Sequence, residues 1–415
     1  MKKYKLGECL TVKHGWAFKG EYFSESGTQC ILTPGNFYEA GGFKPNSGKE
    51  RYYTGEYPAE YLCRKGDLIV AMTQQAEGLL GSTALVPEDG KYLHNQRIGL
   101  VTCNEAILDP LFAYFLFMTK TVREQIERSS SGTKVKHTSP ERIYDVEVVL
   151  PDVADQKKIA HILMDIENKI NDNSRINDNL QQQLKLLYDY WFTQFDFPDK
   201  NGSPYHSSGG KMVYSAELKQ DIPEGWTINK LSDLCTVVLG GTPSTEVAEY
   251  WNGEINWLNS GEVAQFPVID TALKITHLGM KNSPAKIMEI GTTIVSITGN
   301  IRTSVLAIKT CANQSVVGIL ESKILRHPFV HQFMLRMLAR FSVLSTGNCQ
   351  QHINKGTIED ALILLPRPDI LMKYYQLAQP LYDEISKLAL ENLELTRLRD
   401  WLLPMLMNGQ ATISD

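Results

Sequence analysis

The chain has 415 residues and a formal net charge of -5, with 43% hydrophobic and 21% charged residues. This length predicts two to four domains, and the composition excludes a disordered or fibrous protein. The longest apolar run, Leu111–Met118, is far shorter than the ~20 residues of a membrane-spanning helix, and the N-terminal residues lack the apolar stretch of a signal peptide. We therefore expect a cytoplasmic protein with no membrane segment.

The cysteines are scattered and form no Cys-x-x-Cys pair, which argues against a disulfide framework or a zinc site. We expect them to be reduced and partly buried. The histidines do not cluster at the spacing of metal ligands, so the sequence predicts no metal site.

An internal repeat organises the chain. Leu150-Pro151 recurs 215 residues later as Leu365-Pro366, each time after a strand-like run, and four further pairs share this offset: Gly132 and Gly347, His137 and His352, Asp145 and Asp360, Asn177 and Asn392. Upstream, residues 66–73 match residues 291–298 at an offset of 225, and Asn95-Gln96 matches Asn313-Gln314 at 218. A duplicated module with loops of different length explains these offsets.

Each repeat divides into a β-rich module and a helical segment. Short runs rich in Ile, Val, Tyr and Thr, separated by Gly, Pro, Asn and Ser, predict mostly-β modules over residues 1–150 and 199–365. Residues 151–198 and 366–415 carry long helical patterns. The predicted fold is therefore α+β, with two mostly-β domains, two long helices and a pseudo-two-fold internal repeat.

Both helical segments fit a heptad pattern of apolar residues. The first seam is Ile159, Leu163, Ile166, Ile170, Asn173, Asn177, Leu180, Leu184, Leu187 and Trp191; the second is Tyr374, Ala378, Leu381, Ile385, Leu388, Asn392, Leu395, Arg399, Leu402 and Leu406. The pattern predicts that the helices pack on one another as an antiparallel pair, with Asn177 and Asn392 fixing register. Two separate amphipathic helices, each on its own domain, are the alternative. Pro380 predicts a kink in the second helix.

The net charge seems to disfavour a nucleic-acid partner, but the excess acid lies entirely in the helical segments and both modules are neutral. Loops in each module concentrate cations, amides and hydroxyls, which are the groups that pair with base edges and phosphates in DNA. These loops include the turns Asn95-Gln96-Arg97 and Asn313-Gln314. Each loop taken alone is also consistent with a solvated turn.

The candidate DNA-binding residues come from these loops. In the first module they are Lys44, Asn46, Lys49, Arg51, Thr73, Gln74, Gln75, Arg97, Thr133, Lys134, Lys136 and His137; in the second they are Thr242, Ser244, Asn259, Ser260, Thr298, Asn300, Arg302, Gln350, Gln351 and His352.

Catalytic motifs are absent from the sequence. It contains no phosphate-binding P-loop, dinucleotide fingerprint, His-Glu-x-x-His or Gly-x-Ser-x-Gly motif, and no Asn-Pro-Pro-[Tyr/Phe] signature of amino-methyltransferases. The stretch Pro151–Lys157 fits the Pro-Asp…[Asp/Glu]-x-Lys pattern of metal-dependent nucleases. Because it opens a predicted helix, we interpret its acids as first-turn residues that favour the helix dipole. No catalytic residue is predicted.

The layout resembles the specificity (S) subunit of type I restriction-modification systems. The resemblance spans the chain and is carried by the C-terminal stretch 398–410 (LRDWLLPMLMNGQ), by Gly240-Gly241-Thr242-Pro243-Ser244 and by residues 250–258 (YWNGEINWL). The Asn-Gln pairs and the Ser/Thr-Gly segments before each helix are also similar.

The resemblance implies that each β module is a target recognition domain for one half of a split, asymmetric sequence in double-stranded DNA, and that the helices set the gap between the halves and dock partners. The chain would be non-catalytic and would hold no cofactor. Two methyltransferase (M) subunits would use S-adenosylmethionine to methylate adenine, and two restriction (R) subunits would use ATP and Mg²⁺ in DNA cleavage.

Two alternatives remain open at this point: a stand-alone restriction-modification enzyme with a cryptic catalytic site, and a duplicated scaffold that does not bind DNA.

Overall fold

The computed structural model describes residues 1–45, 48–74, 76–132, 135–344 and 352–411. The chain divides into two compact units, which we call unit 1 (Met1–Ile170 with Leu395–Asp415) and unit 2 (Asn171–Glu394). Each unit combines one β-rich module with part of each long helix, α5 (Val153–Phe192) and α10 (Pro368–Met407). Within the described ranges, no helix is both long enough and apolar enough to cross a membrane.

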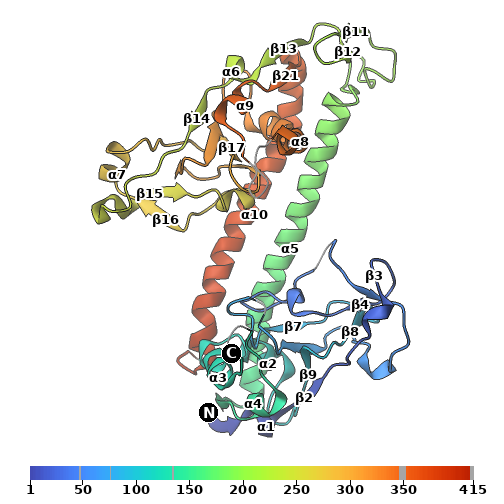
Figure 1. The fold of residues 1–415 in the computed structure, drawn as a ribbon, viewed down its shortest axis with the longest axis vertical. Helices are drawn as coiled ribbons and strands as arrows, with labels where there is room; N and C mark the ends of the chain where they lie inside the picture. The colour runs from blue at the N-terminus through green and yellow to red at the C-terminus, as the bar shows by residue number, and fades with distance from the viewer. Residues whose placement is uncertain (46–47, 75, 133–134, 345–351, 412–415) are drawn as a thin grey trace. The chain divides into compact units, whose positions relative to one another are not determined.

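The module of unit 1 is built on a four-stranded antiparallel sheet in the order β2-β9-β6-β7. These strands are β2 (Leu10–His14), β6 (Leu68–Ala71), β7 (Thr83–Leu85) and β9 (Ile98–Cys103). A second sheet has the order β3-β5-β4-β8, with β3 (Phe23–Ser24), β4 (Cys30–Ile31), β5 (Tyr52–Tyr53) and β8 (Tyr92–Leu93). Strand β1 (Lys2–Lys5) pairs with β10 (Glu147–Leu150). The helices are α1 (Leu6–Cys9), α2 (Pro110–Leu116), α3 (Lys120–Ser129) and α4 (Pro140–Tyr144), and Figure 1 shows α2, α3 and α4 beside the N-terminal part of α5.

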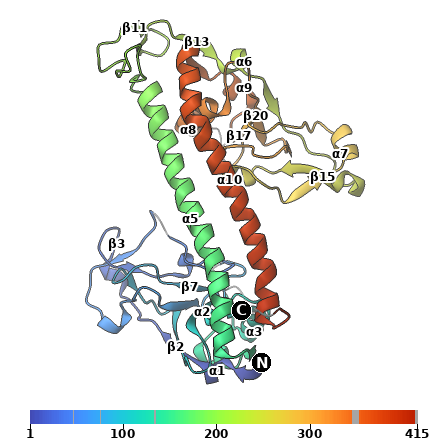
Figure 2. The same ribbon diagram turned by 180° about the vertical axis from the view of Figure 1, so that it is seen from behind.

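The module of unit 2 repeats this plan with the sheet β14-β20-β17-β18. Its strands are β14 (Val237–Leu239), β17 (Thr293–Ser296), β18 (Thr303–Val305) and β20 (Val316–Ile319). A second sheet joins β16 (Leu273–Ile275), β15 (Trp251–Leu258) and β19 (Cys311–Ala312), and β13 (Thr227–Lys230) pairs with β21 (Leu362–Leu365). The remaining elements are the hairpin β11 (Met212–Ser215) with β12 (Gln220–Pro223), and the helices α6 (Leu231–Leu234), α7 (His277–Lys281), α8 (His327–Leu344) and α9 (Lys355–Glu359). Figure 2 shows α8 and α9 beside the N-terminal part of α10.

Matched contacts confirm the internal repeat. The ammonium of Lys5 lies 2.9 Å from the Asp145 carboxylate, and that of Lys230 lies 2.8 Å from the Asp360 carboxylate. The two aspartates are separated by the predicted offset of 215. The strand-like runs before Leu150-Pro151 and Leu365-Pro366 are β10 and β21, and each is paired with a strand near the start of its own module: β10 with β1, and β21 with β13.

The heptad pattern explains why two 40-residue helices form and pair. Every one of the 20 predicted seam residues is buried or half-buried. In unit 1 the Arg399 guanidinium lies 2.6 Å from the Glu167 carboxylate. In unit 2 the Asn173 amide donates to Asn392 Oδ1 at 2.9 Å, and Asn177 Nδ2 lies 3.5 Å from the carbonyl of Ile385, four residues further along α5 and seven back along α10. The helices are therefore antiparallel, as predicted.

The ends of both helices also belong to module cores. In unit 1, Leu163 of α5 and Leu406 of α10 join a cluster with Phe112 of α2. In unit 2, Leu184 of α5 and Tyr374 of α10 belong to the hydrophobic cluster that also contains Val317 of β20. The packing of the two helices on one another excludes the alternative of two separate helices. Helix α10 continues through Pro380 without interruption.

Candidate nucleic-acid interface

One edge of each four-stranded sheet gathers several of the predicted DNA-contacting side chains that the structure describes. In unit 1, Ala71 at the end of β6 pairs with Ile98 at the start of β9, so Thr73 and Arg97 leave the sheet at the same edge. In unit 2, Ser296 at the end of β17 pairs with Val316 at the start of β20. The residues that follow β17 and precede β20 therefore lie at the corresponding edge.

A tight turn before β9 presents Gln96 and Arg97 at this edge. The Asn95 side-chain carbonyl accepts from the Arg97 amide at 3.1 Å, and the Arg97 carbonyl accepts from the Met72 amide at 3.1 Å. Beneath the turn, His94 hydrogen-bonds the Ile98 carbonyl through Nε2 at 2.8 Å, and burial lowers the pKa of His94 to about 4, so the ring is neutral. The Gln96 and Arg97 side chains are exposed on a fixed backbone.

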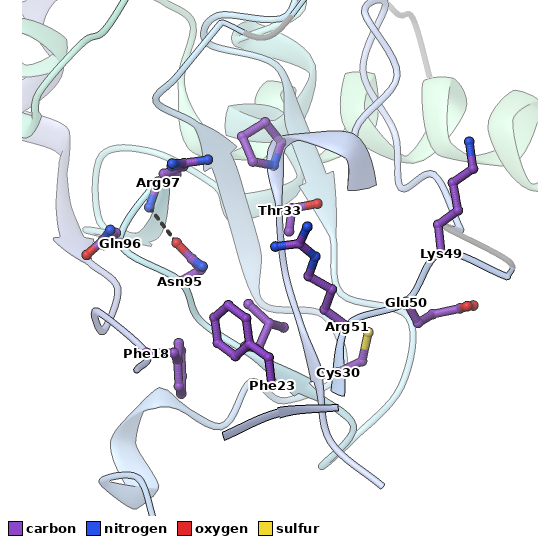
Figure 3. A pocket seen from close by; sticks show the side chains of 12 residues that line it. Phe18, Phe23, Cys30, Thr33, Lys49, Glu50, Arg51, Asn95, Gln96 and Arg97 are labelled. Atoms are coloured by element: carbon purple, nitrogen blue, oxygen red, sulfur yellow. Dashed lines mark hydrogen bonds between the residues drawn. The ribbon is translucent and has the colours of Figure 1, made fainter. Parts of the chain in front are cut away.

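A pocket of about 410 Å³ lies beside this turn and brings together three predicted residues: Lys49, Arg51 and Arg97. Phe18 and Phe23 form part of its wall. Figure 3 shows Arg51 and Arg97 extending into the same space, whereas Lys49 points away from it. Two guanidinium groups beside aromatic rings suit the negative potential and the stacked bases of a nucleic acid.

Unit 2 repeats the turn with different side chains. The Asn313 side-chain carbonyl accepts from the Ser315 amide at 3.0 Å, and the Ser315 carbonyl accepts from the Ile297 amide at 2.9 Å. Ser315 thus occupies the backbone position that Arg97 holds in unit 1. Gln314 is exposed at the tip of the turn, and its side-chain carbonyl accepts a hydrogen bond from the predicted residue Thr242.

A threonine and a histidine meet at the same place in both modules. Thr73 and His137 form an antiparallel bridge, with Thr73 Oγ1 3.1 Å from His137 Nδ1. Thr298 and His352 form the same bridge, with the corresponding atoms 3.2 Å apart. All four were predicted from the sequence, and the structure pairs residues that lie 64 and 54 positions apart.

Close to these pairs lie other predicted residues. The Gln74 amide donates to the Lys136 carbonyl at 2.9 Å, and the Lys136 ammonium forms an ion pair with Glu127. In unit 2, the carbonyls of Asn300 and Arg302 lie 2.8 and 3.5 Å from the Ser296 hydroxyl, and both of these predicted side chains are exposed.

Four predicted residues have mainly local contacts. Lys44 is exposed, with its ammonium 5.6 Å from the centre of the Tyr38 ring. The Ser244 carbonyl accepts from the Trp251 indole at 3.0 Å. Asn259 and the half-buried Ser260 belong to a turn after β15, where Asn259 Oδ1 accepts from the amide of Gly261 at 2.8 Å. Six predictions, Asn46, Gln75, Thr133, Lys134, Gln350 and Gln351, lie outside the described residues.

Arg123 was not among the predicted residues. Its guanidinium donates to the backbone carbonyls of Phe117, Gly78, Leu80 and Glu39 at 2.8 to 3.0 Å, and burial lowers its pKa to about 10. Arg123 therefore holds the loop before β7 from within the module. Nothing in the sequence around it marks this role, because all four acceptors are main-chain atoms. The sequence-based prediction also misses Gln96 and Gln314, although the matching Asn-Gln pairs could have identified them.

The two predicted register residues lie in the contact between α5 and α10. Asn392 bonds Asn173, and Asn177 faces the Ile385 carbonyl. Asn173 is fully buried, with its Nδ2 also 3.0 Å from a Glu391 carboxylate oxygen. Asn177 and Asn392 are equivalent in the repeat, but because the helices are antiparallel they do not contact each other through these bonds: Asn392 bonds Asn173, and Asn177 faces Ile385.

Among the described residues, no three His, Cys, Asp or Glu side chains are grouped so that they could hold a metal ion. Six of the seven cysteines lie in the described ranges, and all six are free thiols. Burial raises the pKa of several of these thiols, with that of Cys63 reaching about 12, so they stay protonated near neutral pH.

The fold and its two matched edges define a duplicated protein in which an antiparallel helix pair joins two β-rich modules. The chain matches the model of the type I restriction modification DNA specificity domain family over residues 1–182 and 223–394. It belongs to this family and is the specificity subunit of a type I restriction-modification system.

Two relatives and one solved structure illustrate the similarity. The type I restriction enzyme MjaIX specificity subunit of Methanocaldococcus jannaschii is 26% identical over 312 residues, covering 73% of this chain and 69% of the relative. The HindI specificity subunit of Haemophilus influenzae is 21% identical over 408 residues, covering 85% and 88%. The crystal structure of a type I S subunit from M. genitalium aligns with a TM-score of 0.60 at 14% identity, covering 100% of this chain and 96% of that one, which shows a shared fold.

Proposed function

We propose that the two modules are target recognition domains, each reading one half of a bipartite, asymmetric sequence in double-stranded DNA through the sheet edge described above. The observation that carries this proposal is one backbone frame with different side chains at its tip. Arg97 and Ser315 hold the same position in the two turns, and guanidinium and hydroxyl groups favour different base edges. Two modules with one frame and different tips suit two different half-sites.

The two long helices would set the number of unread base pairs between the half-sites. A helix rises 1.5 Å per residue, so the length of a continuous helix pair is a suitable ruler for DNA. The acidic excess of these segments is compatible with this role, because a spacer need not contact phosphates.

Partner docking is supported by exposed apolar residues on the helices that occupy equivalent positions in the two repeats. Ile162 and Leu377, which are 37% and 52% exposed, are related by the offset of 215, and so are Leu186 and Trp401, which are 68% and 60% exposed. Each unit carries one residue of each pair. Unit 1 thus exposes Ile162 and Trp401, and unit 2 exposes their repeat equivalents Leu377 and Leu186. Two equivalent sets of exposed apolar residues suit two copies of one partner, which we assign as the two methyltransferase subunits. Two restriction subunits would complete the assembly.

The chain itself would perform no chemistry. S-adenosylmethionine, ATP and Mg²⁺ would bind to the partner subunits, which would methylate adenine and cleave DNA in the cytoplasm. Purified chain incubated with DNA and labelled S-adenosylmethionine should transfer no methyl group until a methyltransferase subunit is added. Methyl transfer by the chain alone would support the stand-alone enzyme, an alternative that family membership does not favour.

Methylation mapping tests the central proposal. DNA from cells that coexpress this chain with a cognate methyltransferase subunit should carry methylated adenines at one bipartite motif, and cells without the chain should lack them. Replacing residues 1–150 with the first module of another family member should change one half of that motif. A change in both halves would contradict the assignment of one half-site to each module.

A further inference from the structure

Both modules share the threonine–histidine contact between predicted side chains, in residue identity and in geometry. Thr73 with His137, and Thr298 with His352, have matching backbone bridges and matching Oγ1 to Nδ1 distances of 3.1 and 3.2 Å. The backbone next to each histidine is held in the same way. The Thr138 amide donates to the Met72 carbonyl and the Ile353 amide donates to the Ile297 carbonyl, each at 3.0 Å, and each acceptor directly precedes the threonine.

The residues around this contact differ between the modules. Arg97 corresponds to Ser315, and Gln74, which follows Thr73, corresponds to Gly299, which follows Thr298. Under the proposed function the modules read different half-sites, so side chains that read bases must differ. A pair that stays the same at the same edge suits the part of DNA that is the same in every sequence, the sugar-phosphate backbone.

The chemistry of the pair fits a phosphate oxygen. A threonine hydroxyl that donates to Nδ1 leaves the ring proton on Nε2, where it is available as a hydrogen-bond donor. Both histidines are exposed, whereas Thr73 is only 6% exposed. In the tautomer that accepts at Nδ1, the threonine holds the ring from the protein side, and the exposed ring offers its Nε2–H to an acceptor outside. Phosphodiester oxygens are pure acceptors and accept such bonds strongly because they are charged.

We propose that His137 and His352 each donate a hydrogen bond to a phosphodiester oxygen, one in each half-site, with Thr73 and Thr298 as the positioning residues. This inference rests on the proposed DNA recognition. It divides the candidate interface into a shared backbone contact, which sets the register of each module on the duplex, and the variable turn tips, which select bases.

The test measures binding of the full-length chain to two 40-base-pair duplexes, one with the mapped target and one with both half-sites scrambled. His137→Phe and His352→Phe remove the ring nitrogens and keep an aromatic ring, and His161→Phe on the exposed surface of α5 is the control. Each of the first two variants should bind both duplexes about tenfold more weakly, the effect of losing one hydrogen bond to a charged group, with an unchanged ratio between duplexes. His137→Gln should recover part of the loss, because its amide can replace Nε2–H. Thr73→Val should weaken binding, and Thr73→Ser should not.

Methylphosphonate substitution separates a phosphate contact from a structural role. Replacing the contacted phosphate with neutral methylphosphonate should weaken wild-type binding and leave His137→Phe unaffected. Hydrogen exchange at the Thr138 amide should stay the same in His137→Phe. Selective loss of binding to the target duplex would make His137 a base-reading residue and overturn the proposal, as would equal binding of variant and wild type. Failure of the proposed function itself would appear separately, as a wild-type chain that does not distinguish the two duplexes.

Discussion

Arg123 shows how one half-buried side chain can hold several loop segments of a module together. Its guanidinium donates to four backbone carbonyls, which come from the C-cap of α2, from the loop before β7 and from Glu39. Among the described residues, no carboxylate forms an ion pair with Arg123. Burial lowers the pKa of its guanidinium to about 10. Its role is therefore to supply hydrogen-bond donors to loops that have no regular secondary structure of their own.

Replacing Arg123 with Met should destabilise unit 1 locally by about 2 to 3 kcal/mol, because several carbonyls lose their donor in a half-buried setting. Hydrogen exchange by mass spectrometry should show faster exchange in residues 76–82, whose turn the guanidinium holds. Arg128→Met is the matched control, since Arg128 lies on the same helix with a side chain that is 77% exposed and paired to Glu124. Equal protection of the loop in both variants would contradict the role of Arg123.

The turn tips carry the base-reading prediction. Arg97→Ser gives the first turn the side chain that the second turn carries. It should change the base preference at one position of the first half-site by about 1 to 3 kcal/mol and leave the base preferences in the second half-site unchanged. Ser315→Arg should act in the same way on the second half-site alone. Selection of binding sites from a randomised duplex pool measures both effects. A uniform loss of affinity without altered preference would show that Arg97 contacts phosphate instead.

Single residues also show where prediction from sequence stops. The constant offset in the sequence identifies His137 and His352 as equivalent. It does not predict their contacts with Thr73 and Thr298, because these depend on which segments lie side by side in the folded module. Lys44 was selected as a cation in a loop, yet it lies over Tyr38 and is not among the residues around the pocket that Arg51 and Arg97 share. Composition identifies loops rich in binding groups, whereas tertiary packing decides which of those groups converge.

At the scale of elements, the long helices were the most predictable part of the fold. Their heptad seams extend over 40 residues each, so many independent positions agree on one face. The opposition of Asn173 and Asn392 could not be read from the repeat, which matches Asn177 with Asn392. The repeat says which positions are equivalent in the two helices, whereas the contact joins Asn392 to Asn173, one helical turn away from the repeat equivalent of Asn392. The short strands were predicted only as β-rich runs, because strands of two to eight residues carry too little periodicity to fix pairing.

The spacer role makes a prediction about length. Inserting one heptad into α5 between Ile170 and Leu180, with a matching heptad in α10 between Ile385 and Leu395, should keep both seams in register. The added seven residues should lengthen the gap in the target by about 10 Å, roughly three base pairs. Methylation mapping of the variant reads the gap directly. An unchanged gap with intact methylation would show that the helices do not measure the DNA.

At the scale of the whole molecule, the repeat gives each unit the same backbone plan. Each unit is built from one module and from portions of both helices, so neither repeat in the sequence forms a compact unit by itself. The second helix of the chain completes the unit of the first module, and the end of the first helix joins the core of the second. A partner that recognises one module together with its helices would therefore find an equivalent site in the other unit.

This duplication predicts the stoichiometry of assembly. Trp401→Glu should remove one of two methyltransferase subunits and Leu186→Glu the other, because a charge in an apolar contact is not compensated on binding. The double variant should bind none. Native mass spectrometry of the coexpressed complex would show one, one and zero methyltransferase subunits. Ile176→Glu is the control, since Ile176 is 46% exposed on α5 but its repeat equivalent is Glu391, so it belongs to no matched pair. Loss of both subunits from either single variant would show that the two subunits bind cooperatively through one surface. That result would contradict the proposal of one binding surface on each unit.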